Sequence, residues 1–586
     1  MRTRHPLIAA AAGLAAAAML TGCTSAGGND GNASTKPSGS TEHTVDTVRI
    51  GTAEENQGPA PAIKGAKQGG TITVYETSDY AHLDPQKIYS SAYQDVYNLV
   101  GRQLTGYANI DGQKVLVGDL ATDTGKVSDG GKTWTFTLRD GLKWEDGKAI
   151  TSADVKYGIE RSFGKGFEVG LPYFQQWLTG AESFTDAQKQ YSGPKDGDLD
   201  AIETPDDKTI VLHFPKAQTD VAYAAAWGTT APVREDKDTG TKYDQKPFSS
   251  GPYRITEHKQ NSSMTMVRNT HWDPKSDPIR YQNAETYAFK FGQQPVNINQ
   301  RLLSSSGEDA HAMSTLTGVS TELIDTLNAR ADKDKISYRQ DTGYTYWYVL
   351  NNRHITDVNL RKALLYAFPK QQVRQQEGGS YAGDLATTIS SPTLAGFQKY
   401  DVFKADERGD VAKAKEYLAK SKQKLDKITL AYSNTSPSKQ RQAEAIASAY
   451  KKIGITVVTK PVDGSNYYSA TATEDTPYDM WWTGWATDWP TPSTLIDTVF
   501  NSGSPAYANQ AGYNSKTTDA ELKRIAALTD TDEKSKAYFA LEQKIMADAP
   551  VIPYVYAIST FIHGKGLVLP NAGTPMSVLN GAYIAD

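Results

Sequence analysis

Residues 428–459 read ITLAYSNTSPSKQRQAEAIASAYKKIGITVVT, and this stretch is the part of the chain that best predicts the fold class. Residues 428–432 and 456–459 are short apolar runs typical of strands. The intervening residues 439–452 have the spacing of an amphipathic helix, which we expect to end at Gly454. A strand–helix–strand unit of this length favours two parallel strands joined by a right-handed crossover. The sequence therefore predicts an α/β architecture.

The N-terminal half also contains predicted strands and turns. Residues 134–138 alternate between polar and apolar side chains, and Asp140 with Gly141 is expected to close a hairpin after them. Thr151 then begins a helix, and Asp154 follows three residues later to complete a capping box. Further elements are predicted as a strand at 71–75 and helices at 92–104, 519–527 and 533–547. With 586 residues, the chain is too long for a single core, and we expect two or three domains.

The composition is that of a soluble globular protein, with 38% hydrophobic and 22% charged residues. The formal net charge of −5 argues against nucleic acid as the main partner. The sequence has no G-x-S-x-G elbow, no H-E-x-x-H motif and no pair of cysteines, and its nine histidines lack metal-ligand spacing. We therefore expect no catalytic residues, no metal and no cofactor.

The N-terminus has the features of a bacterial lipoprotein signal. Arg2 and Arg4 precede an apolar run over residues 7–20, which is too short to span a bilayer comfortably. Residues 20–23 read L-T-G-C, which resembles the lipobox of bacterial lipoproteins and implies cleavage before Cys23 and lipid attachment to its thiol. The alternative is an ordinary secretory signal that a cysteine follows by chance.

The mature chain is expected to begin with a linker. Residues 1–22 form the predicted signal peptide, and residues 23–67, rich in Gly, Ser, Thr, Asn and Pro, predict a flexible tether. Cys23 is the only cysteine, so a lipid on its sulfur leaves no thiol for a disulfide. The stability of the folded part must then come from a large core.

A tryptophan-rich run is the most unusual segment of the sequence. Residues 478–492 read YDMWWTGWATDWPTP and hold four of the ten tryptophans of the chain. Asp488 lies between the last two of these tryptophans, and no basic residue occurs in the run. One interpretation is a buried strand whose aspartate caps the turn at Pro490; another is an aromatic pocket with an anionic anchor for a ligand ammonium group. The pattern alone leaves both interpretations open.

Several motifs in order along the chain resemble those of one family. Residues 247–253 read PFSSGPY and are similar to its G-T-G-P-Y turn, and residues 267–272 read VRNTHW and are similar to its R-N-x-x-Y-W motif. Residues 348–352, 360–364 and 478–488 continue the pattern. On these motifs, the chain is identified as a member of the family 5 extracellular solute-binding proteins, the peptide- and nickel-binding components of ABC importers. The resemblance covers the chain from about residue 69 to its C-terminus.

The resemblance implies a fold and a set of boundaries. The expected fold is a two-lobed, periplasmic-binding-protein-like α/β clamp with an extra subdomain in the first lobe. Residues 68–350 and 554–586 would form lobe I, with the inserted subdomain at about 100–204, and residues 351–553 would form lobe II. The hinge is expected near residues 348–352 and 553–556, and the protein is expected to be a monomer.

The resemblance also implies a ligand site around the G-W-x-x-D pattern of residues 484–488. In peptide-binding relatives the aspartate of this pattern pairs with the ligand's terminal ammonium, and the extended peptide pairs with the protein as an added strand. The predicted ligand-binding residues are Asp488, Trp485, Trp482, Trp489, Tyr467, Ala486 and Thr487. The first-lobe segments 89–93 and 170–177 are expected to face the same site. Trp482 occupies a position where some peptide binders have an arginine for the ligand carboxylate, so ligand length is left open.

The function expected from this resemblance is capture of short peptides for import. Held by a lipid on the extracellular face of the cell membrane, the protein would pass its ligand to the transmembrane subunits of an ABC permease. An oligosaccharide receptor of the same fold is the first alternative, because tryptophan faces also stack on sugars, and a metal-chelate binder is the second. A lipid-anchored hydrolase and a sensory receptor are further possibilities.

Overall fold

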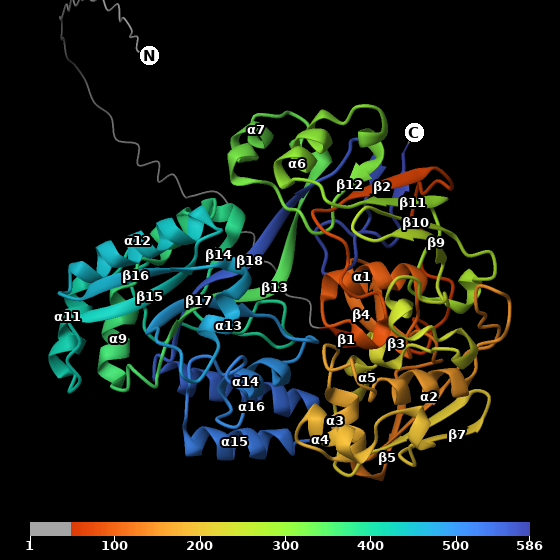
Figure 1. Cartoon of the computed structure of the whole chain (residues 1–586), viewed down its shortest axis with the longest axis horizontal. Coiled ribbons are helices and arrows are strands. Elements are labelled where there is room, and N and C mark those ends of the chain that lie inside the picture. The colour runs from red at the N-terminus through yellow and green to blue at the C-terminus, as the bar shows by residue number, and fades with distance from the viewer. Residues whose placement is uncertain (1–47, 586) are drawn as a thin grey trace, which may run out of the picture. The chain divides into compact units, whose positions relative to one another are not determined.

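Strands before residue 337 form three sheets in the part of the chain that a computed structural model describes, residues 48–585 (Figure 1). The largest of the three has the strand order β12-β2-β11-β10-β9, and β2 is the strand predicted at residues 71–75. Ile72 and Val74 of β2 are fully buried, so this sheet contributes to the main core of this part. The bounds are β1 (Arg49–Ile50), β2 (Thr71–Tyr75), β3 (Thr105–Ile110), β4 (Gln113–Gly118), β5 (Lys126–Ser128), β6 (Thr133–Thr137), β7 (Ile202–Asp206), β8 (Thr209–His213), β9 (Tyr253–Lys259), β10 (Ser263–Arg268), β11 (Thr286–Lys290) and β12 (Ala312–Met313).

A four-stranded sheet with the order β5-β6-β8-β7 contains the strand predicted at residues 134–138. Its first hairpin turns at Asp129 and Gly130, which both have positive φ angles. The hairpin expected at Asp140 and Gly141 is therefore wrong, because the second neighbour of β6 is β8, which lies about 70 residues further along the chain. Asp154 Oδ2 accepts from the Thr151 amide at 2.9 Å, and this confirms the predicted capping box.

Eight α-helices precede residue 337 in the described chain, and eight follow it. The first eight are α1 (Ser91–Val100), α2 (Ser152–Arg161), α3 (Tyr173–Thr179), α4 (Phe184–Gln190), α5 (Val221–Ala224), α6 (Pro295–Ser304), α7 (Ile324–Asn328) and α8 (Lys333–Ile336). The others are α9 (Val358–Ala367), α10 (Lys370–Gln375), α11 (Val411–Lys420), α12 (Pro437–Lys451), α13 (Tyr467–Thr471), α14 (Ser493–Phe500), α15 (Lys516–Ala526) and α16 (Thr531–Met546). Helix α1 ends four residues before the predicted boundary, since Gly101 follows it in an extended conformation.

The second half of the chain builds a six-stranded sheet with the order β14-β18-β13-β17-β15-β16, and β19 (Leu567–Val568) pairs with β20 (Tyr583–Ile584) in a separate two-stranded sheet. Strands β15 and β16 are parallel neighbours joined through α12, as the sequence predicted. Gly454 follows the helix with a φ of 86°, a conformation that glycine adopts without strain. Two apolar cores cover the two faces of this sheet. The bounds are β13 (Ser337–Leu350), β14 (Gly383–Leu385), β15 (Lys427–Ser433), β16 (Thr456–Val462), β17 (Met480–Trp485) and β18 (Val551–Ile562).

The long strands β13 and β18 run side by side and connect these two halves (Figure 1). We call the part before β13 the first lobe and the part between β13 and β18 the second lobe. Ile336 and Ile562 pack in a first-lobe core, whereas Tyr348 and Tyr554 pack in a second-lobe core. The register of the two strands breaks between Asp341 and Thr345. The strands therefore cross between the lobes near this break. The two segments predicted for the hinge, 348–352 and 553–556, overlap these strands on the second-lobe side of the break.

The described part of the predicted tether lies against the first lobe. The Gly51 amide donates to the Leu116 carbonyl at 2.8 Å, and Asn56 Oδ1 accepts from the Gly118 amide at 2.6 Å. Residues 48–67 thus extend the folded body to the N-terminal side of residue 68. The predicted signal peptide and Cys23 lie outside the described residues. Between residues 48 and 585, no helix combines the length and the apolar character that crossing a membrane requires.

Candidate ligand-binding site

Strand β17 places the tryptophan-rich run in the middle of the six-stranded sheet. Its neighbours are β13, which is antiparallel to it, and β15, which is parallel. Because side chains alternate between the two faces of a strand, Trp481 and Trp482 point to opposite sides of the sheet. Trp481 is fully buried and donates from Nε1 to Gln510 Oε1 at 2.9 Å. Trp481 is therefore a core residue, whereas Trp482 and Trp485 are half-buried.

Asp488 lies in the loop between β17 and α14, where the second lobe contacts the first. Its Oδ2 accepts a hydrogen bond from the hydroxyl of Tyr173, the first residue of α3, and a longer one of 3.3 Å from the Tyr89 hydroxyl. The main-chain oxygen of Asp488 accepts from Trp227 Nε1 at 2.8 Å. These three donors belong to the first lobe, so the loop is held across the lobe boundary. Both tyrosines come from the first-lobe segments that sequence analysis expected to face the ligand.

The Asp488 carboxylate has no cationic partner. No lysine, arginine or histidine of residues 48–585 forms an ion pair with it, and no donor among those residues hydrogen-bonds to its Oδ1. Burial raises the pKa of Asp488 to about 6, while the hydrogen bonds from Tyr173 and Tyr89 act in the opposite direction. A half-buried carboxylate with one free oxygen can therefore accept both a hydrogen bond and a positive charge from a ligand.

Trp489 extends from the same loop into the first lobe. Its side chain is 3% exposed and belongs to the first-lobe core. The indole contacts the Tyr173 ring, with 4.6 Å between ring centroids, and the Trp177 ring, with 6.0 Å. Its Nε1 donates to Asp220 Oδ2 at 3.0 Å. Because Tyr173, Trp177 and Asp220 all belong to the first lobe, the Trp489 side chain joins the two lobes. The predicted contact between Trp489 and the ligand stays a prediction.

A charged network covers Trp482 in the second lobe. Lys439 Nζ lies 3.7 Å from the centroid of the Trp482 ring and forms an ion pair with Glu377. The Tyr554 hydroxyl connects this ion pair to the indole, because it donates to Glu377 Oε2 and accepts from Trp482 Nε1, both at 2.9 Å. Tyr467 is buried, and its hydroxyl bonds to both the amide and the carbonyl of Trp482. These contacts fix the position of Trp482 beside the predicted ligand site.

Four tyrosine rings stand out by their exposure, and one of them contacts the same carboxylate. The most exposed aromatic side chains of the described chain are Tyr89, Tyr344, Tyr468 and Tyr507, between 40% and 64% exposed. Burial raises the pKa of Tyr344, and the nearby Asp488 charge adds to this effect. Tyr507 contributes to the raised pKa of Tyr89, and Tyr344 contributes to that of Tyr468. Of the four rings, Tyr89 is the one that hydrogen-bonds to Asp488, and Tyr344 is affected by the Asp488 charge.

The remaining predicted residues, Ala486 and Thr487, are half-buried in the loop that carries Asp488. Five residues of the site were not predicted from the sequence as site residues: Trp227, Asp220, Lys439, Glu377 and Tyr554. None of these residues lies in a motif, and each reaches the site from a distant part of the chain, so no local signal identifies them. No cluster of three or more His, Cys, Asp or Glu side chains suited to a metal ion occurs between residues 48 and 585.

Residues 115–507 match the family described as "Bacterial extracellular solute-binding proteins, family 5 Middle". The chain belongs to this family. The match confirms the family predicted from the motifs. A curated relative of this family 5 protein is the "Oligopeptide-binding protein OppA" of Bacillus subtilis (strain 168), which is 26% identical over 481 residues, covering 76% of this chain and 82% of the relative.

Solved structures share the fold of this family 5 protein. "Clavulanic acid biosynthesis oligopeptide binding protein 2" has a TM-score of 0.79 at 24% identity, covering 91% of this chain and all of that one. "MppA Periplasmic Murein Tripeptide Binding Protein, Unliganded Open Form" has a TM-score of 0.70 at 21% identity, covering 89% and 99%. These likenesses confirm the predicted two-lobed α/β fold.

Proposed function

We propose that this family 5 protein is the substrate-binding component of an ABC importer and that it captures short peptides between its lobes. The observation that carries the proposal is the Asp488 carboxylate, which contacts both lobes, lacks a cation and leaves Oδ1 free. The terminal ammonium of a peptide supplies both the missing charge and the missing hydrogen-bond donor. The name of the Bacillus subtilis relative, an oligopeptide-binding protein, agrees with this ligand class.

The exposed tyrosines support a sequence-tolerant peptide site. Tyr89 lies on the first lobe, and Tyr344, Tyr468 and Tyr507 lie on β13 or in the second lobe. Amphipathic rings of this kind contact varied side chains through their faces and accept or donate hydrogen bonds through their hydroxyls. With Trp485, Ala486 and Thr487 beside the anchor, these rings would contact the residues that follow the ligand's first one.

The transport role extends the same proposal. In this proposal the protein is a monomer, and a lipid on Cys23 anchors it to the extracellular face of the cell membrane. From there it delivers peptide to the permease subunits. Ligand bound to both lobes stabilises the form in which the lobes are in contact, and the permease would recognise that form. We propose that β13 and β18 act as the hinge, because they are the two strands that pass from one lobe core to the other.

A matched pair of ligands tests the anchor. Calorimetric titration would compare a short alanine-rich peptide library with the same library acetylated at its N-termini. Acetylation converts the ammonium into a neutral amide with one N–H and adds a small acyl group. We expect affinity to fall at least about thirtyfold, the loss typical of removing one partner of a buried charge pair. Equal affinity for the two libraries would exclude Asp488 as an ammonium anchor, and no binding of either would reject the peptide ligand class.

The oligosaccharide alternative needs free indole faces. Lys439 covers the ring of Trp482, and Tyr173 packs against the ring of Trp489. Trp481 is completely buried. Of the four indoles in the run, only Trp485 is left to stack on a sugar ring. Thermal melting with sugar libraries provides the check, because a tight ligand raises the midpoint of unfolding by mass action.

A further inference from the structure

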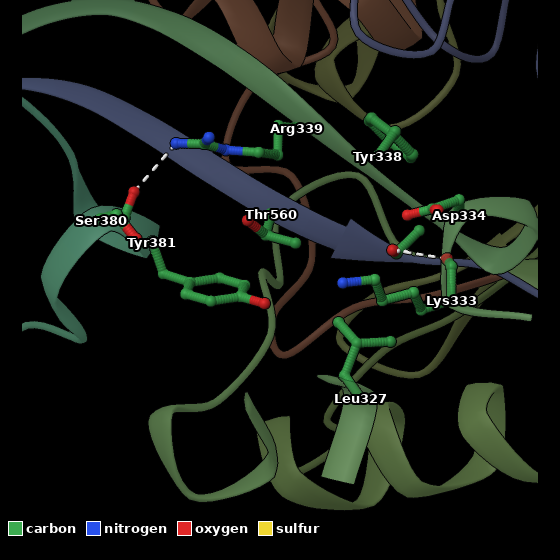
Figure 2. A pocket seen from close by; sticks show the side chains of 9 residues that line it. Leu327, Lys333, Asp334, Tyr338, Arg339, Ser380, Tyr381 and Thr560 are labelled. Carbon is green, nitrogen blue, oxygen red and sulfur yellow. Dashed lines mark hydrogen bonds between the residues drawn. The ribbon is translucent and has the colours of Figure 1, made fainter. Parts of the chain in front are cut away.

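A cavity of about 460 Å³ lies where the hinge strands meet both lobes (Figure 2). Its walls come from α7 and α8 of the first lobe, from β13 and β18, and from the 3-10 helix η10 (Gly379–Ala382) of the second lobe. None of its lining residues contacts Asp488 or is one of the predicted ligand-binding residues. A volume of this size is sufficient for a small organic molecule.

The cavity wall carries more positive than negative charge. Lys333 and Arg339 supply two cations, and Asp334 supplies one carboxylate. Lys333 Nζ forms no ion pair and no hydrogen bond with the residues that the structure describes, and Figure 2 shows its ammonium end directed into the space between the lining side chains. Arg339 uses one amino group, Nη2, to donate to the Ser380 carbonyl at 2.9 Å, and its other donors are available. The geometry therefore favours an anion.

A buried hydroxyl in the same wall also lacks a partner. Thr560 is 6% exposed, and its Oγ1 has no hydrogen-bond partner between residues 48 and 585. Leaving a buried hydroxyl unpaired costs on the order of 1–3 kcal/mol, so such groups are normally satisfied. An oxygen of an anion bound beside Lys333 and Arg339 would supply the missing acceptor.

The cavity lies at a contact between the lobes. The Tyr381 hydroxyl of η10 donates to Asn328 Oδ1 of α7, which links the second lobe to the first. Arg339 of β13 bonds to Ser380 of η10, which fixes the same 3-10 helix to a hinge strand. A molecule in the cavity would touch both lobes and both hinge strands at once. Its binding energy would depend on the angle between the lobes.

We propose that this cavity is a second ligand site, which takes a small anion with a carboxylate or phosphate group and stabilises the arrangement in which Tyr381 contacts Asn328. Lys333 and Arg339 bind the anionic group, and Thr560 donates a hydrogen bond to it. Since the peptide site lies between the same two lobes, anion and peptide affinities are coupled. The coupling rests on the proposed peptide function, whereas anion binding itself does not.

Calorimetric titration of the full chain with citrate and with inorganic phosphate, at constant ionic strength in chloride, tests the site directly. We expect saturable one-to-one binding of at least one of them, and the tighter of the two identifies the carboxylate or the phosphate source. Lys333→Met should weaken this binding at least tenfold, whereas Lys335→Met removes the same charge from the same helix α8 outside the cavity and should change nothing. Equal losses in the two variants, or no saturable heat with either anion, would reject the site.

Thr560→Val provides a second and nearly isosteric test. Because the threonine hydroxyl has no partner between residues 48 and 585, this substitution should leave the melting temperature unchanged or higher while it weakens anion binding several-fold. Unchanged anion affinity would remove Thr560 from the site. A fall in melting temperature would show that its hydroxyl has a structural partner.

Thermodynamic linkage between the two ligands tests their coupling separately from the proposed peptide function. Saturating anion should change peptide affinity by the same factor by which saturating peptide changes anion affinity. If both ligands bind without affecting each other, the coupling is excluded and the anion site stands. If no peptide binds, the proposed function fails, while the anion titration still decides whether the cavity is a site.

Discussion

Buried carboxylates occur in two very different environments in this protein. In the first lobe, Asp119 and Asp277 lie with Arg102 and Arg280 in a fully buried group of four, and ion-pair distances between them run from 2.6 to 3.5 Å. Between the lobes, Asp488 has two tyrosine hydroxyls and no cation from the part of the chain that the structure describes. Both regions remove carboxylates from water, but only the first supplies the compensating charge from the protein itself.

The pKa values follow this difference. Burial alone would raise the pKa of Asp277, but the charges of Arg102 and Arg280 outweigh it, and the pKa lies below its ordinary value. Burial raises the pKa of Asp488 to about 6, because no cation opposes the loss of water. A carboxylate that lacks its counter-charge inside the protein is the place where a charged ligand gains most by binding.

A third acid shows that the absence of a cation does not by itself mark a site. Glu542 is fully buried without an ion pair, but both of its oxygens are used. Its Oε1 accepts from the amides of Ile389 and Ser390, and its Oε2 accepts from the Ser390 hydroxyl. Asp488 differs because its Oδ1 remains free. Among these three environments, Asp488 is the acid that combines a free oxygen with the lack of a cation from residues 48–585, which are the two features that the proposed ammonium contact would use.

Breaking the paired group should have the largest effect. Asp119→Asn leaves Arg102 and Arg280 with a single carboxylate in a buried environment. Removing one partner of a buried ion pair typically costs about 3–5 kcal/mol, so we expect the free energy of unfolding to fall by that amount. Denaturant unfolding measures it. A loss below about 1 kcal/mol would mean that the charges of this group are solvated or repaired by neighbours.

Neutralising the unpaired acid should abolish binding and spare the fold. Asp488→Asn keeps the shape of the side chain and its acceptor for Tyr173, but it removes the charge that pairs with a ligand ammonium. We expect peptide affinity to fall at least about thirtyfold, a change of 2–5 kcal/mol, with a melting temperature close to that of the natural protein. Calorimetry and thermal melting give the two values.

The control for this variant is Glu542→Gln, which neutralises a buried carboxylate elsewhere in the second lobe. It should change stability and leave peptide affinity within about twofold. If Glu542→Gln weakens binding as much as Asp488→Asn does, the effect comes from the stability of the lobe and not from an anchor.

Acid should weaken peptide binding by an amount set by the pKa of Asp488. With a pKa of about 6, the carboxylate is mostly ionised at pH 7, and about a tenth of it is ionised at pH 5. Peptide amino groups keep their charge over this range. We therefore expect affinity to fall about tenfold between pH 7 and pH 5. Calorimetry across this range measures it; a flat profile, or an equal slope for Asp488→Asn, would contradict the assignment.

Local periodicity was sufficient to predict much of the fold. The unit of β15, α12 and β16 follows from apolar spacing and from Gly454, and the capping box at Thr151 follows from a three-residue spacing. The pairing of β6 with β8 was not predictable in the same way, because residues far apart in the chain form it. The crossing of β13 with β18 also joins distant residues, and it was the family resemblance, not local periodicity, that indicated it. Turn residues at Asp140 gave a misleading signal for the same reason.

The residues of the candidate site fall into the same two groups, those that the sequence indicated and those that only distant contacts reveal. Asp488 is conspicuous in sequence because it is an acid among indoles, and its two tyrosine donors lie in segments that the family resemblance had indicated. Lys439 could not be identified as a site residue from the sequence, because nothing in its local pattern differs from that of other helical lysines. Its contact with Trp482, 43 residues later, is known only from the structure. The environment of Trp489 depends on α3 of the other lobe, and no local pattern describes that contact.

The smallest predicted effect is a shift in the pH dependence of binding when one of the two tyrosines that hydrogen-bond to Asp488 loses its hydroxyl. Tyr89→Phe removes the longer hydrogen bond, 3.3 Å, and leaves that of Tyr173. Both hydrogen bonds lower the pKa of Asp488 against the effect of burial, so losing one should move the midpoint of the pH profile upward. The shift should be a fraction of a pH unit, because a hydrogen bond of this kind contributes only about 0.5–1.5 kcal/mol. Tyr468→Phe, a change at another exposed tyrosine on α13 that forms no hydrogen bond with Asp488, should leave the midpoint in place. A downward shift in Tyr89→Phe would mean that the hydroxyl of Tyr89 stabilises the protonated acid instead of the ionised one, and the assignment of donor and acceptor across the lobe boundary would have to be reversed.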